Sequence, residues 1–275
     1  MLISKQLEDI KELQRQCEEN DQIQLKLNWD MLRNRDEQEK HDFFHYENGE
    51  LVAFIGVYGF GHKVELCGMV KPGHRRRGFF SKLLTSALEG IKERKYNQVL
   101  LNAPSNSFSA KGFLQNIPCE FSFSEYQMKW SGIELVGDDD VTIRHSKPED
   151  RKDEIQLDIL CFGFSEEEAT DYNDRMNQEE TQQFYMIEYN EKTVGKIRVS
   201  HNDKEAWIYG FAIFPEYQGQ GIGRKALKKI IMQEHKKGYD IFLEVEAKNS
   251  NALRLYESCG FTTIHVQDYY QYIIK

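Results

Sequence analysis

Apolar and polar residues in the second half of the chain follow the periods of strands and helices. Strands are predicted at 141–144, 184–188, 193–199 and 206–214, and a short polar turn at Asn190 and Glu191 joins the second to the third. Helical spacing begins at Gly221, and the helix is predicted to turn lysines outward and an apolar stripe inward: Ile222, Ala226, Leu227, Ile230 and Ile231. Three more helices are predicted in this half. One covers 149–160, one begins at a capping box of Ser165 and Glu168, and one covers 249–259 and ends at Gly260. Two more strands are predicted at 241–245 and 261–275.

The first half of the chain repeats this pattern. The segment MVKPGHRRRGFFSKLL from Met69 aligns with AIFPEYQGQGIGRKAL from Ala212, which places Gly78 on Gly221. Farther upstream, NGELVAFI aligns with NEKTVGKI. Two copies of one mixed α/β domain are therefore predicted.

The predicted boundary between the copies lies where the pattern breaks. Small residues and an acidic run interrupt it in SGIELVGDDD. We predict an N-terminal domain at 1–132, a linker at 133–140 and a C-terminal domain at 141–275.

Composition and charge narrow the class of protein. The 275 residues are 40% apolar and 29% charged, as is typical of globular chains. A formal net charge of -9 argues against a general nucleic-acid binder. The most apolar run, 51–60, is too short to cross a bilayer, and the N-terminus has no secretory pattern. Five scattered cysteines without a CxxC pair favour single thiols in a reducing cytoplasm, and no metal-binding motif is present.

The glycine-rich turn before the helix at Gly221 carries the most chemical information. Gly219, Gly221 and Gly223 follow the strand that ends at Pro215. Glycines let backbone N–H groups converge, and the first helical turn adds unpaired N–H groups and a positive dipole end. This combination predicts a phosphate-sized anion site. The spacing fits neither a Walker loop nor the GxGxxG fingerprint.

Two motifs, in order, resemble the GNAT N-acetyltransferase superfamily. QGQGIG at 218–223 resembles its [QR]-x-x-G-x-[GA] acetyl-CoA loop, and NSNALRLYESCGF from Asn249 resembles its N-x-x-A-x-x-L-Y-x-x-x-G-F segment. The resemblance covers 141–275 and, more weakly, 1–132, and the tandem architecture is similar to that of mycothiol synthase-like proteins. It implies an α/β (α+β) fold of two GNAT-like domains, each a mixed, mostly antiparallel central sheet flanked by helices.

The resemblance also implies how acetyl-CoA, the co-substrate, would be held. The pantetheine arm would meet the main chain of the strand before the loop, at Phe211, Ala212 and Ile213. The pyrophosphate would be cradled by backbone N–H groups of the loop: Gln218, Gly219, Gln220, Gly221, Ile222, Gly223 and Arg224. Asn249 would contact the pantetheine arm, although an asparagine here suits a helix N-cap equally.

Acetyl transfer to an amine implies an acid and a route for the amine proton. Tyr256 occupies the family position of the acid that protonates the departing thiolate; its other interpretation is packing on the sheet. Many relatives carry a glutamate on the strand before the loop, where this chain has Trp207. Glu244, Glu246 and Tyr209 remain candidates for the base, as does a water chain.

The first copy departs from the family pattern at three positions. Phe80 replaces the small residue that closes the loop, Leu114 stands in place of Tyr256, and Ser107 stands in place of Asn249. Phe80 is expected to crowd the helix start, and the loss of the tyrosine removes the usual acid. We expect this copy to be catalytically silent.

The predicted function is therefore a cytoplasmic, acetyl-CoA-dependent N-acetyltransferase whose active copy is 141–275. It would transfer an acetyl group directly to a primary amine of a small molecule, peptide or protein. The alternative is a non-catalytic module that binds acetyl-CoA as a sensed or structural ligand. Arg75, Arg76 and Arg77 fall in the anion loop of the first copy, so they predict no general nucleic-acid patch. No membrane or metal partner is expected, and the acceptor and oligomeric state are left open.

Overall fold

The elements of the first half recur in the same order in the second half, which begins with one further strand. The structure is a computed structural model that describes residues 2–35, 40–94, 96–137, 140–179 and 181–273. The elements of the first half are α1 (Ser4–Asp21), α2 (Trp29–Arg33), β1 (Asp42–Glu47), β2 (Glu50–Phe60), β3 (Lys63–Val70), α3 (Phe79–Lys92), β4 (Gln98–Pro104), α4 (Phe108–Leu114) and β5 (Cys119–Trp130). Those of the second half are β6 (Val141–His145), α5 (Arg151–Phe162), α6 (Glu166–Met176), β7 (Gln182–Tyr189), β8 (Lys192–Asn202), β9 (Glu205–Ile213), α7 (Ile222–Lys236), β10 (Asp240–Glu246), α8 (Ser250–Ser258) and β11 (Phe261–Tyr272). Each element predicted for the second half is present, apart from residues 274–275 of the last strand, which lie outside the described residues, and this confirms the mixed α/β class.

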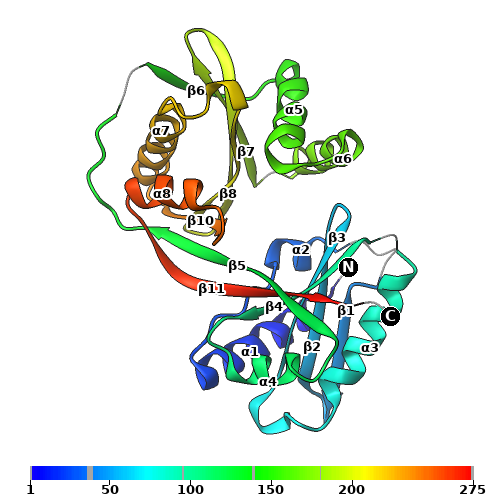
Figure 1. The fold of residues 1–275 in the computed structure, drawn as a ribbon. Helices are drawn as coiled ribbons and strands as arrows, with labels where there is room; N and C mark the ends of the chain where they lie inside the picture. The colour runs from blue at the N-terminus through cyan, green and yellow to red at the C-terminus, as the bar shows by residue number, and fades with distance from the viewer. Residues whose placement is uncertain (1, 36–39, 95, 138–139, 180, 274–275) are drawn as a thin grey trace. The chain divides into compact units, whose positions relative to one another are not determined.

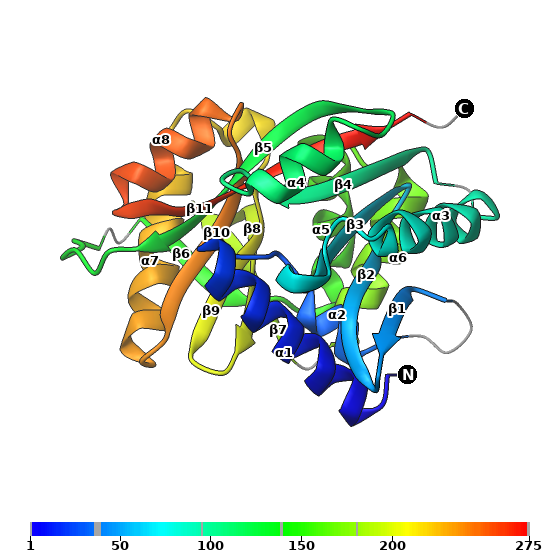
Figure 2. The same cartoon turned by 90° about the horizontal axis from the view of Figure 1, so that it is seen from below.

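Contacts between residues divide the chain into two compact units. Unit 1 comprises Met1–Glu125 and His265–Lys275, and unit 2 comprises Tyr126–Ile264. The linker at 133–140 therefore stays a prediction. The compact units divide at other positions, within β5 and within β11, because each of these strands runs through both units. These two strands lie side by side in Figures 1 and 2.

Each sheet is completed by a strand from the other half of the sequence. In unit 1 the order is β1-β2-β3-β4-β11, with β11 antiparallel to β4 from Gln267↔Pro104 to Gln271↔Leu100. In unit 2 the order is β5-β10-β9-β8-β7-β6. The pairs β3–β4 and β9–β10 are parallel, whereas β1–β2, β2–β3, β6–β7, β7–β8 and β8–β9 are antiparallel. Each sheet is therefore mixed and mostly antiparallel, as predicted.

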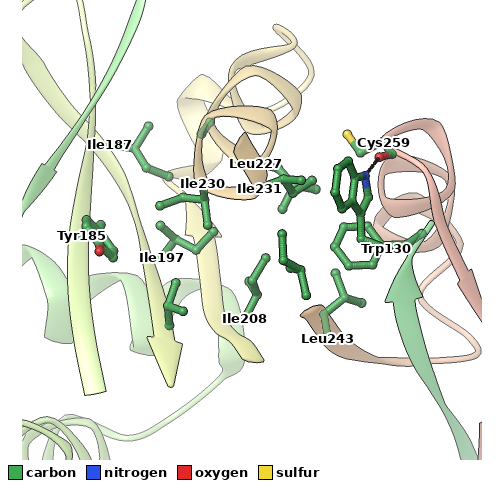
Figure 3. Packing of buried hydrophobic residues seen from close by; sticks show 14 of the residues in the cluster. Trp130, Tyr185, Ile187, Ile197, Ile208, Leu227, Ile230, Ile231, Leu243 and Cys259 are labelled. Atoms are coloured by element: carbon green, nitrogen blue, oxygen red, sulfur yellow. Dashed lines mark hydrogen bonds between the residues drawn. The ribbon is translucent and has the colours of Figure 1, made fainter. Parts of the chain in front are cut away.

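Helices cover both faces of each sheet. In unit 1, α1 and α3 lie on different sides of β2 and β3 (Figure 2), because alternate residues of these strands join two separate clusters. In unit 2, α5 packs on β8 and β9, and α7 lies on the other face. The predicted stripe of α7 is buried to within 2% exposure, and Figure 3 shows Leu227, Ile230 and Ile231 packed against Ile208 and Leu243.

Candidate active site

The parallel strands of each unit pair briefly and then separate. In unit 2, β9 pairs with β10 from Glu205↔Asp240 to Ile208↔Leu243, and β9 then continues to Ile213. The register of β3 with β4 likewise ends at Leu66↔Leu101, before either strand ends. Main-chain groups on the freed edge of each strand are left for another hydrogen-bonding partner. An extended ligand arm can use this edge as an added strand would.

Strand β9 contains one residue more than β3 at the point of separation. Its neighbour β8 pairs Arg198 with Tyr209 and Lys196 with Ala212, so Ile197 alone lies opposite two residues of β9. This arrangement is a β-bulge. In unit 1, β2 and β3 pair without interruption from Ala53↔Val70 to Phe60↔Lys63. The bulge is therefore a feature of unit 2 that its duplicate lacks.

The bulge changes which way the following side chains point. Gly210 lies within it at a φ of +54°, a backbone conformation that favours glycine. After it, Phe211 packs with the cluster on the α7 side, whereas Ala212 packs with Leu157 of α5. Strict alternation from Tyr209 would have placed Phe211 on the α5 side of the sheet and Ala212 on the α7 side. The three strand residues predicted to meet the ligand thus begin at the bulge.

The predicted anion loop has an open backbone cradle. Gly219 and Gly221 have φ values of +74° and +80°, and a Cβ at either position would meet nothing within 4 Å. Gly221 is the N-cap of α7, and Lys225 is the residue whose N–H returns to its carbonyl, at 3.2 Å. The N–H groups of residues 222–224 therefore lack intrahelical partners. This geometry suits a phosphate group.

Two side chains fix the carbonyl at the end of β9. The oxygen of Ile213 accepts hydrogen bonds from Gln218 Nε2 at 2.8 Å and from Cys161 Sγ at 3.5 Å. Gln218 was predicted to act through its backbone, and its side chain thus also braces the loop against the strand. The contribution of Cys161 was missed, although a matching cysteine, Cys17, precedes the first loop.

The candidate acid lies on α8. Tyr256 is half-buried, and its ring meets Phe261 edge to face with centroids 6.1 Å apart. Burial raises the pKa of Tyr256 to about 12, so its hydroxyl is protonated at neutral pH. Asn249 caps the same helix, because its Oδ1 accepts from Ala252 N at 3.1 Å. In unit 1, Ser107 caps α4 in the same way through Ala110 N, at 3.2 Å.

The candidate bases differ in their surroundings. Trp207 is stacked on Phe242 at 5.0 Å and on Tyr209 at 6.3 Å, and donates to Glu205. The stacking shows that Trp207, Tyr209 and Phe242 point toward the same face of the sheet. On β10, Glu244 follows the last parallel pair and, by alternation from Phe242, lies on that same face.

Glu244 is also held in place, whereas Glu246, which shares its face by alternation, forms a more exposed ion pair. Gln127 Nε2 donates to Glu244 Oε1 at 2.8 Å. Glu246 pairs with Lys248 at 2.8 Å, and its side chain is 36% exposed, as is usual for a surface ion pair. Of the two glutamates, Glu244 is therefore better placed beside the separation of β9 and β10.

The arginine cluster of unit 1 occupies the equivalent loop. Arg75 Nη2 pairs with Asp21 at 2.8 Å, and Arg77 pairs with Glu47 at 2.8 Å. Arg76 takes a φ of +64°, and it forms no hydrogen bond or ion pair with the residues that the structure describes. Two of the three charges are thus neutralised locally, and the cluster is part of a loop and not a broad basic patch.

Phe80, which was expected to crowd the helix start, turns its ring toward β3. Its ring lies against Gly68, where a Cβ would be 2.9 Å away, and meets Phe113 edge to face at 4.8 Å. In unit 2 the corresponding helix residue is Gly223, and the ring beside it comes from the strand, as Phe211. Each unit thus has one aromatic ring between this strand and this helix, contributed by the helix in unit 1 and by the strand in unit 2.

Unit 1 accordingly keeps a cavity of about 720 Å³ at its loop. Residues 74–81 line it together with apolar side chains of β3, β4 and α4, including Leu66, Leu101 and Leu114. The cavity thus lies where the parallel strands separate, and Leu114 gives it no acidic hydroxyl at the position of Tyr256.

Among the described residues, no set of three or more His, Cys, Asp or Glu side chains is grouped to hold a metal ion. No helix in the described ranges has the length and apolar character needed to cross a membrane.

Comparison with known proteins finds relatives that match short segments of this chain. The chain is 40% identical over 67 residues to the [ribosomal protein bS18]-alanine N-acetyltransferase of Escherichia coli K12, which covers 24% of this chain and 45% of that protein. It is 35% identical over 63 residues to the N-alpha-acetyltransferase RimI of Mycobacterium tuberculosis, covering 23% of this chain and 39% of that protein. The matches thus span less than half the length of these relatives.

Solved structures share the fold over most of the chain. A GCN5-related N-acetyltransferase from Sphaerobacter thermophilus superposes with a TM-score of 0.77 at 18% identity, covering 96% of this chain and 91% of that one. A tandem GNAT protein from the clavulanic acid biosynthesis pathway superposes with a TM-score of 0.63 at 13% identity, covering 84% and 81%.

The family model for the acetyltransferase (GNAT) family matches the chain twice, at residues 7–115 and 153–261. The two matches together cover most of the sequence and one falls in each copy of the repeat. The chain therefore belongs to the acetyltransferase (GNAT) family and carries its domain in tandem.

Proposed function

We propose that the protein is an acetyl-CoA-dependent N-acetyltransferase whose catalytic copy is the second one. The observation that carries this proposal is the difference between the copies. Unit 2 combines the bulged strand β9, the open glycine loop and a protonated Tyr256. Unit 1 has the loop and the strand separation but neither the bulge nor the tyrosine.

The residues of unit 2 fit acetyl-CoA. The open cradle at Gly219 and Gly221 suits its pyrophosphate, with the N–H groups of 222–224 as donors. The freed edge of β9 from Phe211 to Ile213 suits its pantetheine arm. When bound, acetyl-CoA supplies an activated acetyl thioester as the acyl donor.

Two side chains account for the proton movements. The Tyr256 hydroxyl stays protonated at neutral pH, so it can donate a proton to the leaving group. Glu244 can accept the proton of the attacking amine, directly or through a water, because it lies beside the separation on the face that carries Tyr209. Gln127 holds the carboxylate in place for this role.

The acceptor is proposed to be the α-amine of a peptide or protein. The matched relatives are named for acetylation of an alanine of a ribosomal protein and for N-alpha-acetylation. A carboxylate beside stacked aromatic rings, as at Glu244, Trp207 and Tyr209, suits a cationic amine. The scattered cysteines fit work in the reducing cytoplasm.

The test is release of CoA from acetyl-CoA in the presence of an amine panel. The panel contains peptides with N-terminal alanine, peptides whose only amine is a lysine side chain, and polyamines, with products read by mass spectrometry. We expect acetylation of the α-amine peptides. Binding of acetyl-CoA without transfer to any amine would support the non-catalytic alternative, and absence of binding would exclude both.

A second candidate function concerns unit 1. Its cavity of about 720 Å³ is lined by Gly78, whose backbone is open, and by Arg76, which has no ion pair among the described residues; both favour a second acyl-CoA held without transfer. Equilibrium titration of acetyl-CoA against the full chain gives the stoichiometry. Two sites, one of them lost in Gly78→Trp, would support this candidate, and one site lost in Gly221→Trp would exclude it.

A further inference from the structure

Unit 2 buries a pair of opposite charges between α5 and β8. Lys196 Nζ lies 2.6 Å from Asp158 Oδ2, and their side chains are 6% and 2% exposed. Burial acts on the two groups in opposite directions, since it raises the pKa of Asp158 and lowers the pKa of Lys196. Each charge is therefore costly to bury and depends on the other.

A second buried cation extends this polar cluster along the same face of β8. Arg198 donates through Nη2 to the hydroxyl of Tyr172 on α6 at 2.8 Å, and through Nη1 to Gln182 Oε1 on β7 at 2.5 Å. Its guanidinium also lies over the ring of Tyr209, 5.0 Å from the centroid. Side chains from α5, α6 and β7 thus hold two successive inward-facing residues of β8.

The duplicate shows how the same fold is built without these charges. Cys17 of α1 and Cys161 of α5 donate to equivalent carbonyls, those of Val70 and Ile213, so the two helices can be aligned. The alignment places Gln14 at Asp158, and the repeat places Phe54 at Lys196 and Gly56 at Arg198. Phe54 is fully buried in an apolar cluster of unit 1. Folding of this architecture therefore does not require the charged pair.

The buried cations coincide with the bulge. In the β8–β9 ladder, Arg198 pairs with Tyr209 and Lys196 pairs with Ala212, so the two cations flank the irregularity on either side. Unit 1 lacks both the cations and the bulge. We propose that Lys196 and Arg198, through Asp158 and Tyr172, are positioning residues that clamp the β9 bulge and hold the donor-binding strand in its separated conformation. This inference rests on the proposed function of unit 2.

The test replaces the charged pair with apolar residues of similar size, in the double variant Lys196→Met/Asp158→Leu. Removing both charges from a buried pair leaves stability unchanged or raises it, because the desolvation cost also disappears. We expect the acetyl-CoA Kd to rise at least tenfold and amide deuterium exchange of 209–213 to accelerate to a similar extent. A purely structural pair would leave both quantities unchanged once the variant is folded.

Unit 1 offers a matched control. Arg35 and Asp42 form an ion pair of 2.8 Å with side chains 5% and 7% exposed. In the variant Arg35→Met/Asp42→Leu we expect acetyl-CoA affinity and exchange at 209–213 to stay within twofold of wild type. Wild-type affinity and exchange in the Lys196→Met/Asp158→Leu variant would overturn the inference.

A milder variant keeps the inference testable if the double variant does not fold. Tyr172→Phe removes only the hydroxyl that accepts from Arg198, and we expect a several-fold rise in Kd and faster exchange at 209–213. Unchanged values would overturn the clamp. If wild type itself did not bind acetyl-CoA, the proposed function would fail, while the exchange measurement would still decide whether the cluster holds the bulge.

Discussion

The N-cap glycines of the two loops permit a matched test of the donor site. Gly221 has a φ of +80° and Gly78 a φ of +83°, and a Cβ at either would meet nothing within 4 Å. Alanine at either position therefore brings no clash and costs only the energy of a left-handed backbone, roughly 1–2 kcal/mol. Such a loss lowers the Tm by about 2–4 °C per kcal/mol in a chain of this size class. The two variants should lose equal stability.

Their effects on activity should differ. In Gly221→Ala the strain falls on the loop proposed to hold the pyrophosphate, and relaxation of φ would turn its N–H groups away. If about 1.4 kcal/mol of that strain opposes binding, the KM for acetyl-CoA rises about tenfold. Gly78→Ala should leave KM within twofold of wild type. Calorimetric melting and steady-state CoA release measure both quantities, and the reasoning is refuted if the two variants raise KM equally or if neither does.

Three further variants or conditions test other parts of the site. Glu244→Gln should lower kcat/KM about 10²-fold or more and flatten the acidic limb of its pH profile, since the amide accepts no proton; an unchanged profile would remove Glu244 as the base. Because burial raises the pKa of Tyr256 to about 12, this residue should cause no alkaline fall in kcat below about pH 10, and such a fall that vanished in Tyr256→Phe would contradict its protonated state. Phe80→Gly should destabilise the protein by roughly 1–3 kcal/mol in denaturant titration, because a half-buried ring leaves its contact with Phe113. An unchanged free energy of unfolding would contradict this packing.

Periodicity and end signals were enough to predict the elements of unit 2. The predicted capping box at Ser165 and Glu168 is present in both directions, at 3.2 and 2.9 Å. The α7 stripe is buried because helical spacing fixes which side chains share a face. Caps and helical stripes depend on residues that are close together in the chain, so they can be predicted from the sequence.

The features that distinguish the two copies depend on longer-range pairing. The bulge arises from a single extra residue in β9, which becomes meaningful only once β8 fixes the register. The sequence placed the difference at Phe80, Leu114 and Ser107, and Phe80 was expected to crowd the helix start. The ring of Phe80 instead lies beside Gly68 of β3, at the strand position that Phe211 occupies in unit 2, and this contact between two elements could not be read from the loop alone.

The exchange of β5 and β11 between the units has the same origin. The segment at 261–275 was predicted as a strand, whereas none was predicted at 119–130, and neither segment carries a signal for which sheet it joins. That choice depends on which edge strand each one meets, β4 in the case of β11. The buried pair of Lys196 and Asp158 was likewise invisible, because charged residues at strand and helix positions are usually exposed.

The central claim is that transfer takes place in unit 2 and depends on Tyr256. The most direct measurement is kcat for acetylation of an alanine-terminated peptide by Tyr256→Phe and by Leu114→Phe, the matched position of unit 1. We predict that Tyr256→Phe lowers kcat by about 10²–10⁴-fold, the usual contribution of a general acid, while Leu114→Phe leaves it within twofold. A loss in Leu114→Phe with wild-type turnover in Tyr256→Phe would contradict the account.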